Sequence, residues 1–345
     1  MTTPGCHGTD GRVSFLSDNI EMAPKVLCLR PEADFVRVGV APPPHLAITY
    51  GRPDADGLAA LIGGSDGMVI PAVGPKLDSR LFEDSNLKLV QVTGAGIDRL
   101  DLDALQRLGI AVANVPGGSN DALAEYVLAM SLILLRRLSW ATSELRSGRY
   151  SPFRASMIAE NLSGLRGVLV GIVGFGTVGS AVARAFRAMG SRICYYDPAV
   201  KTNESAPDAR SVSLDDLLTS ADVVTVHVPL LPTTRNLIGA AQLSRMKPGA
   251  VLVDASRGGV VDQAALAEQL RAGRLSGAAV DVYSEEPPPP DHPLLTLDGE
   301  GAARLLLTPH IAGVTRQASA FLFQTAWDNV ERVLLHRQDP LHRVN

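Results

Sequence analysis

This sequence of 345 residues lacks the features that mark several large classes of protein. Its three cysteines, Cys6, Cys28 and Cys194, are scattered and form no CxxC pair, so neither a disulfide framework nor a zinc site is expected. A formal net charge of −4 gives no electrostatic reason to bind nucleic acid or an anionic membrane. The longest apolar runs, such as 122–135, are too short to span a bilayer, and the first 20 residues lack the continuous apolar core of a secretory signal. These absences predict a cytoplasmic protein with reduced thiols and no metal.

The residues that are present fit two globular domains. Hydrophobic residues make up 46% and charged residues 20% of the chain, and its length suits two domains with a core each. Residues 1–22 lack periodicity and predict a loose N-terminal tail. From Lys25 onward, short apolar segments alternate with helix-like ones, which is typical of parallel sheets covered by helices on both faces. The sequence therefore predicts an α/β fold with two doubly wound parallel sheets.

The expected elements follow from this alternation. Strands are expected at 26–29, 46–50, 68–70, 87–93 and 111–115 in the first half, and at 168–173, 191–196, 223–228, 251–254, 277–282 and 305–307 in the second. Short helices are expected at 56–61, 77–82, 101–108, 214–218, 240–246 and 263–272, and an amphipathic helix at about 316–336. A Gly/Pro segment at 116–120 precedes a long helix expected at about 122–138, which predicts a hinge there.

Residues 167–190, GVLVGIVGFGTVGSAVARAFRAMG, combine a buried strand, a glycine-rich turn and an amphipathic helix. Gly174 allows a tight turn, Gly176 lets the backbone approach a pyrophosphate, and Gly179 lets the helix pack closely on the strand. The free N–H groups at the start of the helix attract phosphate. Asp197 ends the next predicted strand, near the expected spacing of about 20 residues, where a carboxylate accepts from a ribose and repels the 2′-phosphate of NADP. The segment predicts a dinucleotide site that prefers NAD.

Three polar residues follow predicted strands of the second half, and the carboxyl ends of parallel strands share one edge. Arg257 in DASRGG offers a planar fork of donors that suits a carboxylate beside a carbonyl. His310 in LTPHIAG titrates in the range needed to exchange a proton with an alkoxide, and Glu286 in YSEEPPPP is placed to orient it. Alone, Arg257 also fits a surface charge and His310 a structural histidine, and Glu285 competes with Glu286. Their joint placement favours a site for a 2-keto acid.

Longer motifs resemble those of a known family. They are VTGAGIDRLDL (92–102), NVPGGSNDALAEYVL (114–128), GIVGFGTVG (171–179), LLTSADVVTVHVPLLPTTRNLI (217–238), MKPGAVLVDASRGGVVD (246–262), AAVDVYSEEP (278–287) and TPHIAGVT (308–315). The sequence is similar to the D-isomer-specific 2-hydroxyacid dehydrogenases, which include the glyoxylate/hydroxypyruvate reductases, over most of its length from about Lys25. The resemblance implies an NAD(H)-dependent enzyme that interconverts a small 2-keto acid and the D-2-hydroxy acid by hydride transfer. It does not identify the substrate.

The resemblance also implies roles for individual residues. Arg257 would bind the carboxylate and carbonyl of the substrate, and His310 would be the acid/base, paired with Glu286. Gly94, Ala95 and Gly96 match the loop that binds the substrate carboxylate. The residues that match cofactor contacts are Gly174, Phe175, Gly176, Thr177, Val178, Gly179, Asp197, Val228, Pro229, Thr234, Ala255, Ser256, Arg257, Asp281, His310 and Gly313. The cofactor would be NAD, with NADH preferred over NADPH.

A domain arrangement is implied as well. Residues 23–119 and 308–345 would form a discontinuous, flavodoxin-like substrate-binding domain, with a Rossmann dinucleotide-binding domain of residues 120–307 inserted in it. The cleft between the two would close on ligand. A homodimer through the long helix is expected, and neither nucleic acid nor membrane is an expected partner. Segment 298–304 looks longer and more polar than usual, which is expected to alter a surface loop.

Other proteins on this fold remain as alternatives. Formate dehydrogenases would have Gln where Glu286 stands, and D-lactate dehydrogenases usually have aromatic residues where Ile311 follows the histidine. Phosphoglycerate dehydrogenases often carry a regulatory domain, which this chain is expected to lack. These departures favour a glyoxylate/hydroxypyruvate-type reductase. An NAD-sensing, non-catalytic binding protein of the corepressor type keeps the same Arg, Glu and His, but its long tails are not matched by the short tail here.

Overall fold

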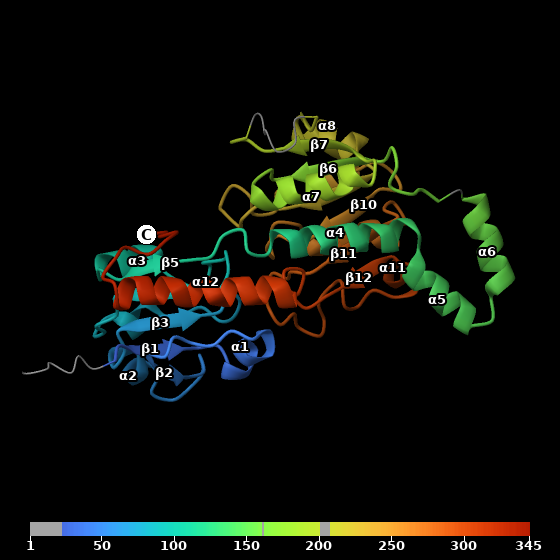
Figure 1. Cartoon of the computed structure of the whole chain (residues 1–345). Helices are drawn as coiled ribbons and strands as arrows, with labels where there is room; N and C mark the ends of the chain where they lie inside the picture. Colours follow the sequence, from blue (N-terminus) through green and yellow to red (C-terminus); the bar gives the residue numbers. More distant parts are fainter. Residues whose placement is uncertain (1–22, 161, 201–207) are drawn as a thin grey trace, which may run out of the picture.

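The computed structural model describes residues 23–160, 162–200 and 208–345, which form two α/β domains (Figure 1). The first domain contains a parallel sheet with the strand order β2-β1-β3-β4-β5. Its strands are β1 (Lys25–Cys28), β2 (Ala47–Tyr50), β3 (Gly67–Ile70), β4 (Leu89–Val92) and β5 (Ala111–Ala113). The strand order reverses between β1 and β3, and open α/β sheets bind ligands beyond the carboxyl ends of the strands at such a point.

Helices cover both faces of the first sheet. One face packs on α1 (Glu32–Val38) and α12 (Arg316–Leu334), and the other on α2 (Leu58–Gly63), the 3₁₀ helix η1 (Ser79–Phe82) and α3 (Leu102–Arg107). The ring of Phe35 in α1 lies 4.7 Å from that of Phe323 and 5.3 Å from that of Trp327, both in α12. The buried amide of Asn329 in α12 donates to the side-chain oxygen of Gln91 in β4 at 2.7 Å. The last long helix therefore packs with the first third of the chain.

The second domain contains a seven-stranded parallel sheet with the order β12-β11-β10-β9-β6-β7-β8. Its strands are β6 (Leu169–Val173), β7 (Arg192–Tyr196), β8 (Arg210–Ser211), β9 (Val223–Val226), β10 (Val251–Asp254), β11 (Gly277–Val280) and β12 (Leu305–Leu307). Its helices are α4 (Asn120–Leu135), α7 (Thr177–Ala188), α8 (Leu214–Ser220), α9 (Ala240–Arg245), α10 (Gln263–Arg271) and α11 (Gly299–Ala303). Here the order reverses between β6 and β9, directly below the glycine-rich turn.

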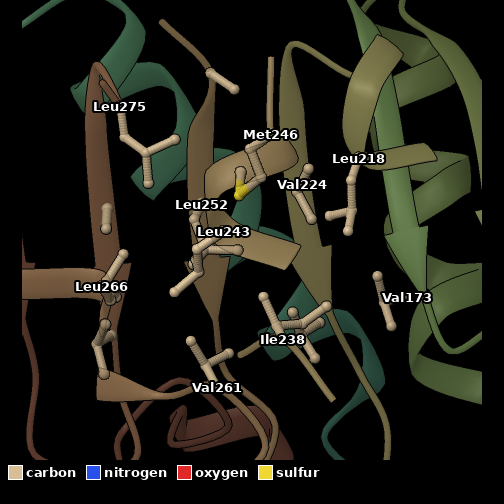
Figure 2. Close-up of a cluster of buried hydrophobic side chains, with 14 of the residues drawn as sticks. Val173, Leu218, Val224, Ile238, Leu243, Met246, Leu252, Val261, Leu266 and Leu275 are labelled. Atoms are coloured by element: carbon tan, nitrogen blue, oxygen red, sulfur yellow. The ribbon is translucent and has the colours of Figure 1, made fainter. Parts of the chain in front are cut away.

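Both faces of this sheet are buried, which explains the continuous apolar runs in its strands. On one face, Val224 of β9 and Leu252 of β10 pack against Leu243 and Met246 from the α9 segment and Leu266 of α10 (Figure 2). On the other face the strands pack against α4 and α7. The expected α/β fold with two parallel sheets is confirmed.

Two helices after α4 were not expected from the sequence. The helix predicted over 122–138 ends at Leu135, because Arg137 takes a left-handed conformation with φ of 50°. The chain then forms α5 (Leu138–Arg146) and α6 (Tyr150–Ala159), which project away from both sheets (Figure 1). Neither helix contains a buried residue, so neither carries the inward-facing apolar stripe on which the prediction relied.

The other differences are small. Segment 77–82 contains a 3₁₀ turn in place of the expected α-helix, segment 298–304 contains the short helix α11 in place of a loop, and α1 was not predicted. Most strands are one to three residues shorter than the apolar runs that predicted them, because the ends of those runs lie in the loops before or after the strand. The predicted tail, 1–22, lies outside the described residues. Within the described part of the chain, no helix is both long and apolar enough to cross a bilayer.

Candidate active site

A cavity of about 520 Å³ lies between the carboxyl ends of the two sheets. The first domain contributes the loop from Gly94 to Gly96 after β4, together with residues that follow β1 and β3. The loops that follow strands of the second sheet contribute Arg257 after β10, Asp281 after β11 and His310 after β12. The cavity therefore combines residues from both domains, as the sequence pattern predicts for Arg257 and His310.

The Arg257 side chain bridges the two domains. Its Nε donates to Oδ2 of Asp98 in the first domain at 3.0 Å, and its Nη1 donates to the carbonyl oxygen of Ser256 at 2.8 Å. The turn that carries Arg257 is fixed by Asp254, whose Oδ1 accepts from the backbone N–H of Ser256 at 3.1 Å and from its hydroxyl at 2.7 Å. Nη2 lies beside Gly96, because a Cβ on Gly96 would come within 2.7 Å of it. The Nη2 donors therefore face the Gly94–Gly96 loop.

The His310 and Glu286 side chains are hydrogen-bonded to each other and line the same cavity. Nδ1 of His310 lies 2.8 Å from Oε2 and 3.1 Å from Oε1 of Glu286, and the two side chains are 25% and 26% exposed. The backbone N–H of Tyr283 donates to Oε1 of Glu286 at 3.0 Å and holds the carboxylate in place. With Nδ1 engaged, Nε2 is the ring nitrogen left to meet a ligand. Glu286, rather than Glu285, thus lies against the histidine.

Asp281 fixes the backbone on which His310 sits. His310 has φ of 54°, a left-handed conformation that needs support from its surroundings. The two carboxylate oxygens of Asp281 accept from the N–H groups of Ile311 and Ala312, both at 2.8 Å, and its carbonyl oxygen accepts from the N–H of His310 at 2.8 Å. The Thr308 hydroxyl also donates to Oδ1 of Asp281 at 2.6 Å. Asp281 therefore holds the backbone of His310 and of the two residues that follow it.

The glycine-rich turn has the geometry that a dinucleotide needs. Gly174 has φ of 92°, and a Cβ there would lie 2.5 Å from the carbonyl oxygen of His227. A Cβ on Gly179 would lie 2.2 Å from the carbonyl oxygen of Gly174, whereas one on Gly176 would meet no atom within 4 Å. Gly176 is the N-cap of α7, and no side chain caps that helix. Open space in front of uncapped N–H groups is what a pyrophosphate requires, so the residues present fit NAD.

The other predicted cofactor residues lie in several places. Ala255, Arg257, Asp281, His310 and Gly313 line the cavity. Asp197 lies outside it at the end of β7, where Oδ2 accepts from the N–H of Phe175 at 2.8 Å and Oδ1 from the N–H groups of Ala199 and Val200. The side chains of two of the predicted residues are buried: the Phe175 ring stacks on Tyr195 at 3.9 Å, and the Ser256 hydroxyl is bonded to Asp254. Thr177 lies at the start of α7, Val228, Pro229 and Thr234 lie after β9, and Val178 follows Thr177.

Three residues that shape the site were not singled out from the sequence. Asp98 pairs with Arg257, and Tyr126 of α4 shares a hydrogen bond of 2.7 Å with the Thr308 hydroxyl, which in turn donates to Asp281. Asp98 lies within the quoted motif 92–102, but its partner is 159 residues away, so only the fold reveals the pair.

A buried carboxyl lies next to the site. Asp254 is 1% exposed, and its Oδ2 has no hydrogen-bond partner among the described residues. Burial raises the pKa of Asp254 to about 6, against the lowering effect of its hydrogen bonds from Ser256. Within the described part of the chain no cluster of His, Cys, Asp and Glu has the geometry to hold a metal ion.

Comparison with known proteins agrees with this geometry. Residues 128–312 match the family model for the NAD-binding domain of D-isomer specific 2-hydroxyacid dehydrogenases. A glyoxylate reductase from Aeropyrum pernix is 34% identical over 293 residues, which are 84% of this chain and 83% of that protein. A D-3-phosphoglycerate dehydrogenase from Archaeoglobus fulgidus is 40% identical over 245 residues, 70% of this chain but only 45% of that longer protein.

Among solved structures, the TT0316 protein from Thermus thermophilus is similar to this chain. It superposes with a TM-score of 0.78 and 32% sequence identity, covering 93% of this chain and 100% of that one. The family model matches more than half of the chain, and relatives align over most of it. Together these matches establish the family. This chain belongs to the D-isomer specific 2-hydroxyacid dehydrogenase family of NAD-binding oxidoreductases.

Proposed function

We propose that this protein interconverts a small 2-keto acid and the corresponding D-2-hydroxy acid with NAD(H) as the redox partner. The observation that carries the proposal is the shared cavity, in which the Arg257 fork and the His310–Glu286 pair face one space between two domains. The glyoxylate reductase name of a relative supports a small 2-keto acid as substrate.

Arg257 and the Gly94–Gly96 loop bind the substrate carboxylate in this proposal. Two of the five guanidinium donors are engaged by Asp98 and Ser256, which leaves three, and the two on Nη2 are proposed to bind a carboxylate oxygen and the carbonyl oxygen. The positive charge beside the carbonyl oxygen also stabilises the negative charge that develops there during reduction.

His310 exchanges the proton. When bound, NADH supplies the hydride that reduces the carbonyl carbon. Nε2 of His310 gives its proton to the carbonyl oxygen, and the same nitrogen takes the proton back from the hydroxyl in the oxidation direction. Glu286 holds Nδ1 protonated and fixes the ring, so that Nε2 points into the cavity. Asp281 contributes by holding the histidine loop.

The remaining expectations on cofactor and domains belong to the same proposal. The carboxylate of Asp197, next to the glycine-rich turn, favours NADH over NADPH because a 2′-phosphate beside it would be repelled. The substrate-binding domain comprises residues 23–119 and 308–345, and the dinucleotide-binding domain residues 120–307. The packing of α12 on the first sheet supports this division.

The protein is further proposed to be a homodimer. Helices α5 and α6 project from the body (Figure 1) and expose four large apolar side chains, with 49% of Leu138, 51% of Leu145, 59% of Tyr150 and 61% of Ile158 accessible. Exposed apolar side chains on two projecting helices suit contact with a second copy of the chain. Sedimentation velocity should show a dimer, and a Leu145→Glu, Ile158→Glu double variant should sediment as a monomer. A wild-type monomer at micromolar concentration would contradict the proposal.

The test of the function is oxidation of NADH with glyoxylate, hydroxypyruvate, pyruvate and phenylpyruvate, followed by absorbance. The wild type should turn over at least one of them, and Arg257→Ala and His310→Ala should each lower kcat/KM by at least about 1,000-fold. NADH binding, measured by fluorescence, should survive in His310→Ala. Equal and negligible rates in the wild type and Arg257→Ala would favour the non-catalytic, corepressor-type alternative.

A further inference from the structure

We propose that Arg30 and Lys76 form a second anion-binding subsite, which makes the enzyme selective for 2-keto acids that carry another anionic group away from the reacting carbonyl. The inference rests on the proposed function and specifies its substrate class. A carboxylate, a sulfonate and a phosphate share the chemistry that the subsite recognises.

The first observation is the position of Arg30. It follows β1, and Ala72 follows β3, so both lie at the point where the strand order of the first sheet reverses. Ligands of open α/β sheets bind at such a point. In the second sheet the equivalent point lies below the glycine-rich turn, which leaves the reversal in the first sheet without an assigned ligand. Arg30, Ala72 and Lys76 all line the cavity between the domains.

The second observation is that the Arg30 guanidinium is held in place by three contacts and still has hydrogen-bond donors available. Nε donates to the Thr93 hydroxyl at 3.3 Å, Nη1 donates to Oδ2 of Asp34 at 2.9 Å, and the guanidinium carbon lies 4.6 Å from the centre of the Phe323 ring. Nη2 donates to no atom in the part of the chain that the structure describes. A planar guanidinium that is fixed on three sides and has a free edge is preorganised to bind an oxyanion.

The third observation concerns charge. Asp34 pairs with Arg37 as well as with Arg30, so this cluster of three keeps one positive charge. Lys76 is exposed at the cavity and makes no ion pair with the described residues. The neighbouring carboxylates are already paired with arginines, Asp34 with Arg30 and Arg37, and Asp98 with Arg257. A substrate anion would therefore meet two cations here, and the acidic side chains beside them are already neutralised.

Arg99, another cation on the cavity wall, has a different role. Its Nε donates to the carbonyl oxygen of Pro75 and its Nη1 to that of Pro71, both at 2.8 Å, and the residue is only 4% exposed. Arg99 therefore fixes the loop that carries Lys76 and leaves anion recognition to Lys76 and Arg30.

The two guanidinium groups flank one short loop. Thr93, which accepts from Arg30, directly precedes Gly94, and Gly96 at the other end of the loop lies against Nη2 of Arg257. A 2-keto acid with its carboxylate on Arg257 and the Gly94–Gly96 loop would thus present its far end to Arg30. A short monoanion such as glyoxylate has no group to place there.

The test compares monoanionic with dianionic 2-keto acids. Pyruvate and hydroxypyruvate serve as monoanions, and oxaloacetate, 3-sulfopyruvate and 3-phosphonooxypyruvate offer a carboxylate, a sulfonate and a phosphate. In the wild type, kcat/KM for at least one dianion should exceed that for pyruvate by about 10-fold or more. Arg30→Met, which keeps an apolar stem on Phe323, should lower the dianion/monoanion ratio about 10- to 100-fold, as expected for a lost charge-assisted hydrogen bond. Arg30→Lys should restore part of it.

Arg52→Met is the control. It removes an arginine of the same domain that pairs with Asp54, and neither residue lines the cavity or contacts the Arg30 cluster, so the dianion/monoanion ratio should stay at the wild-type value. A wild type that prefers monoanions, or an Arg30→Met variant that loses activity equally on all five acids, would overturn the subsite.

Binding separates this inference from the proposed function. Calorimetric titration of the NAD⁺-loaded protein with the same acids should show tighter binding of a dianion than of pyruvate, and the advantage should vanish in Arg30→Met. If no 2-keto acid is turned over, the proposed function fails while this binding result still decides on the subsite. Equal binding of both classes in the wild type would refute it.

Discussion

Gly96→Ala is a sharp test of the substrate site, because one added methyl group acts on one side chain. The new Cβ would lie 2.7 Å from Nη2 of Arg257 and 3.3 Å from Oδ2 of Asp98. Non-bonded carbon and nitrogen atoms prefer separations of at least about 3.5 Å, so the guanidinium must retreat by roughly 0.8 Å. A misplacement of about 1 Å at a substrate-positioning group costs on the order of 100-fold in rate, which is about 2.7 kcal/mol in the activation barrier.

Stability should change far less than activity. The displaced atom is the end of a long side chain that is partly exposed, so the free energy of unfolding should fall by no more than about 1 kcal/mol. The assay pairs kcat/KM with NADH and the best 2-keto acid against urea unfolding of the same variant. Gly63→Ala is the matched control, because its Cβ meets only the Asp84 carbonyl oxygen at 3.7 Å, outside the cavity. A stable Gly96→Ala enzyme with activity within twofold of the wild type would refute the role given to Nη2.

Three further substitutions test other parts of the structure. Asp281→Asn places an amide where a carboxylate accepts from two backbone N–H groups, so kcat should fall about 10- to 100-fold. The Kd for NADH, measured by fluorescence, should change little. A normal kcat would show that these hydrogen bonds are not needed to position His310. Asp254→Asn tests the raised pKa of that carboxyl: the native state holds its proton up to about pH 6, so wild-type stability is lost as pH rises from about 4 through 6. In urea unfolding, the free energy of unfolding of the variant should rise by up to about 3 kcal/mol relative to that of the wild type over that pH range. If the free energies of unfolding of the two proteins changed in parallel with pH, the raised pKa of Asp254 would be contradicted. Asp197→Asn should lower the NADH/NADPH ratio of kcat/KM at least about 10-fold, and an unchanged ratio would exclude a role in cofactor choice.

Much of the fold could be predicted because its signals are local. The central strands of the second sheet are buried on both faces, so each appears as an apolar run. Gly174 and Gly179 meet steric limits that a side chain would violate, and Gly176 leaves open space in front of the helix. Arg257, Glu286 and His310 were predicted to lie together because the carboxyl ends of parallel strands share an edge, and in the structure the three residues line one cavity.

The features that the sequence did not predict are of two kinds: contacts between segments that are distant in the chain, and helices without buried side chains. The pairing of Arg257 with Asp98 joins the two domains, and the Thr93–Arg30 contact joins two strands that are not adjacent in the sheet. Helices α5 and α6 have no buried face, so they lack the stripe of inward-facing apolar residues by which a helix is predicted from sequence. Asp281 was assigned to the cofactor by resemblance alone, and the hydrogen bonds that make it a support for His310 arise only in the folded loop.

The packing of α12 on the first sheet has a consequence for synthesis. Phe35 and its neighbours on that face are covered by Phe323 and Trp327, which leave the ribosome almost 300 residues later. Until then the nascent first sheet exposes one apolar surface and leaves Gln91 without its Asn329 partner. The second domain can complete its own hydrophobic core before α12 is synthesised, whereas the first domain cannot. Chaperone contact is therefore expected to centre on the amino-terminal part, and a ribosome-stalled chain that stops before residue 316 should have a protease-resistant middle and a sensitive beginning.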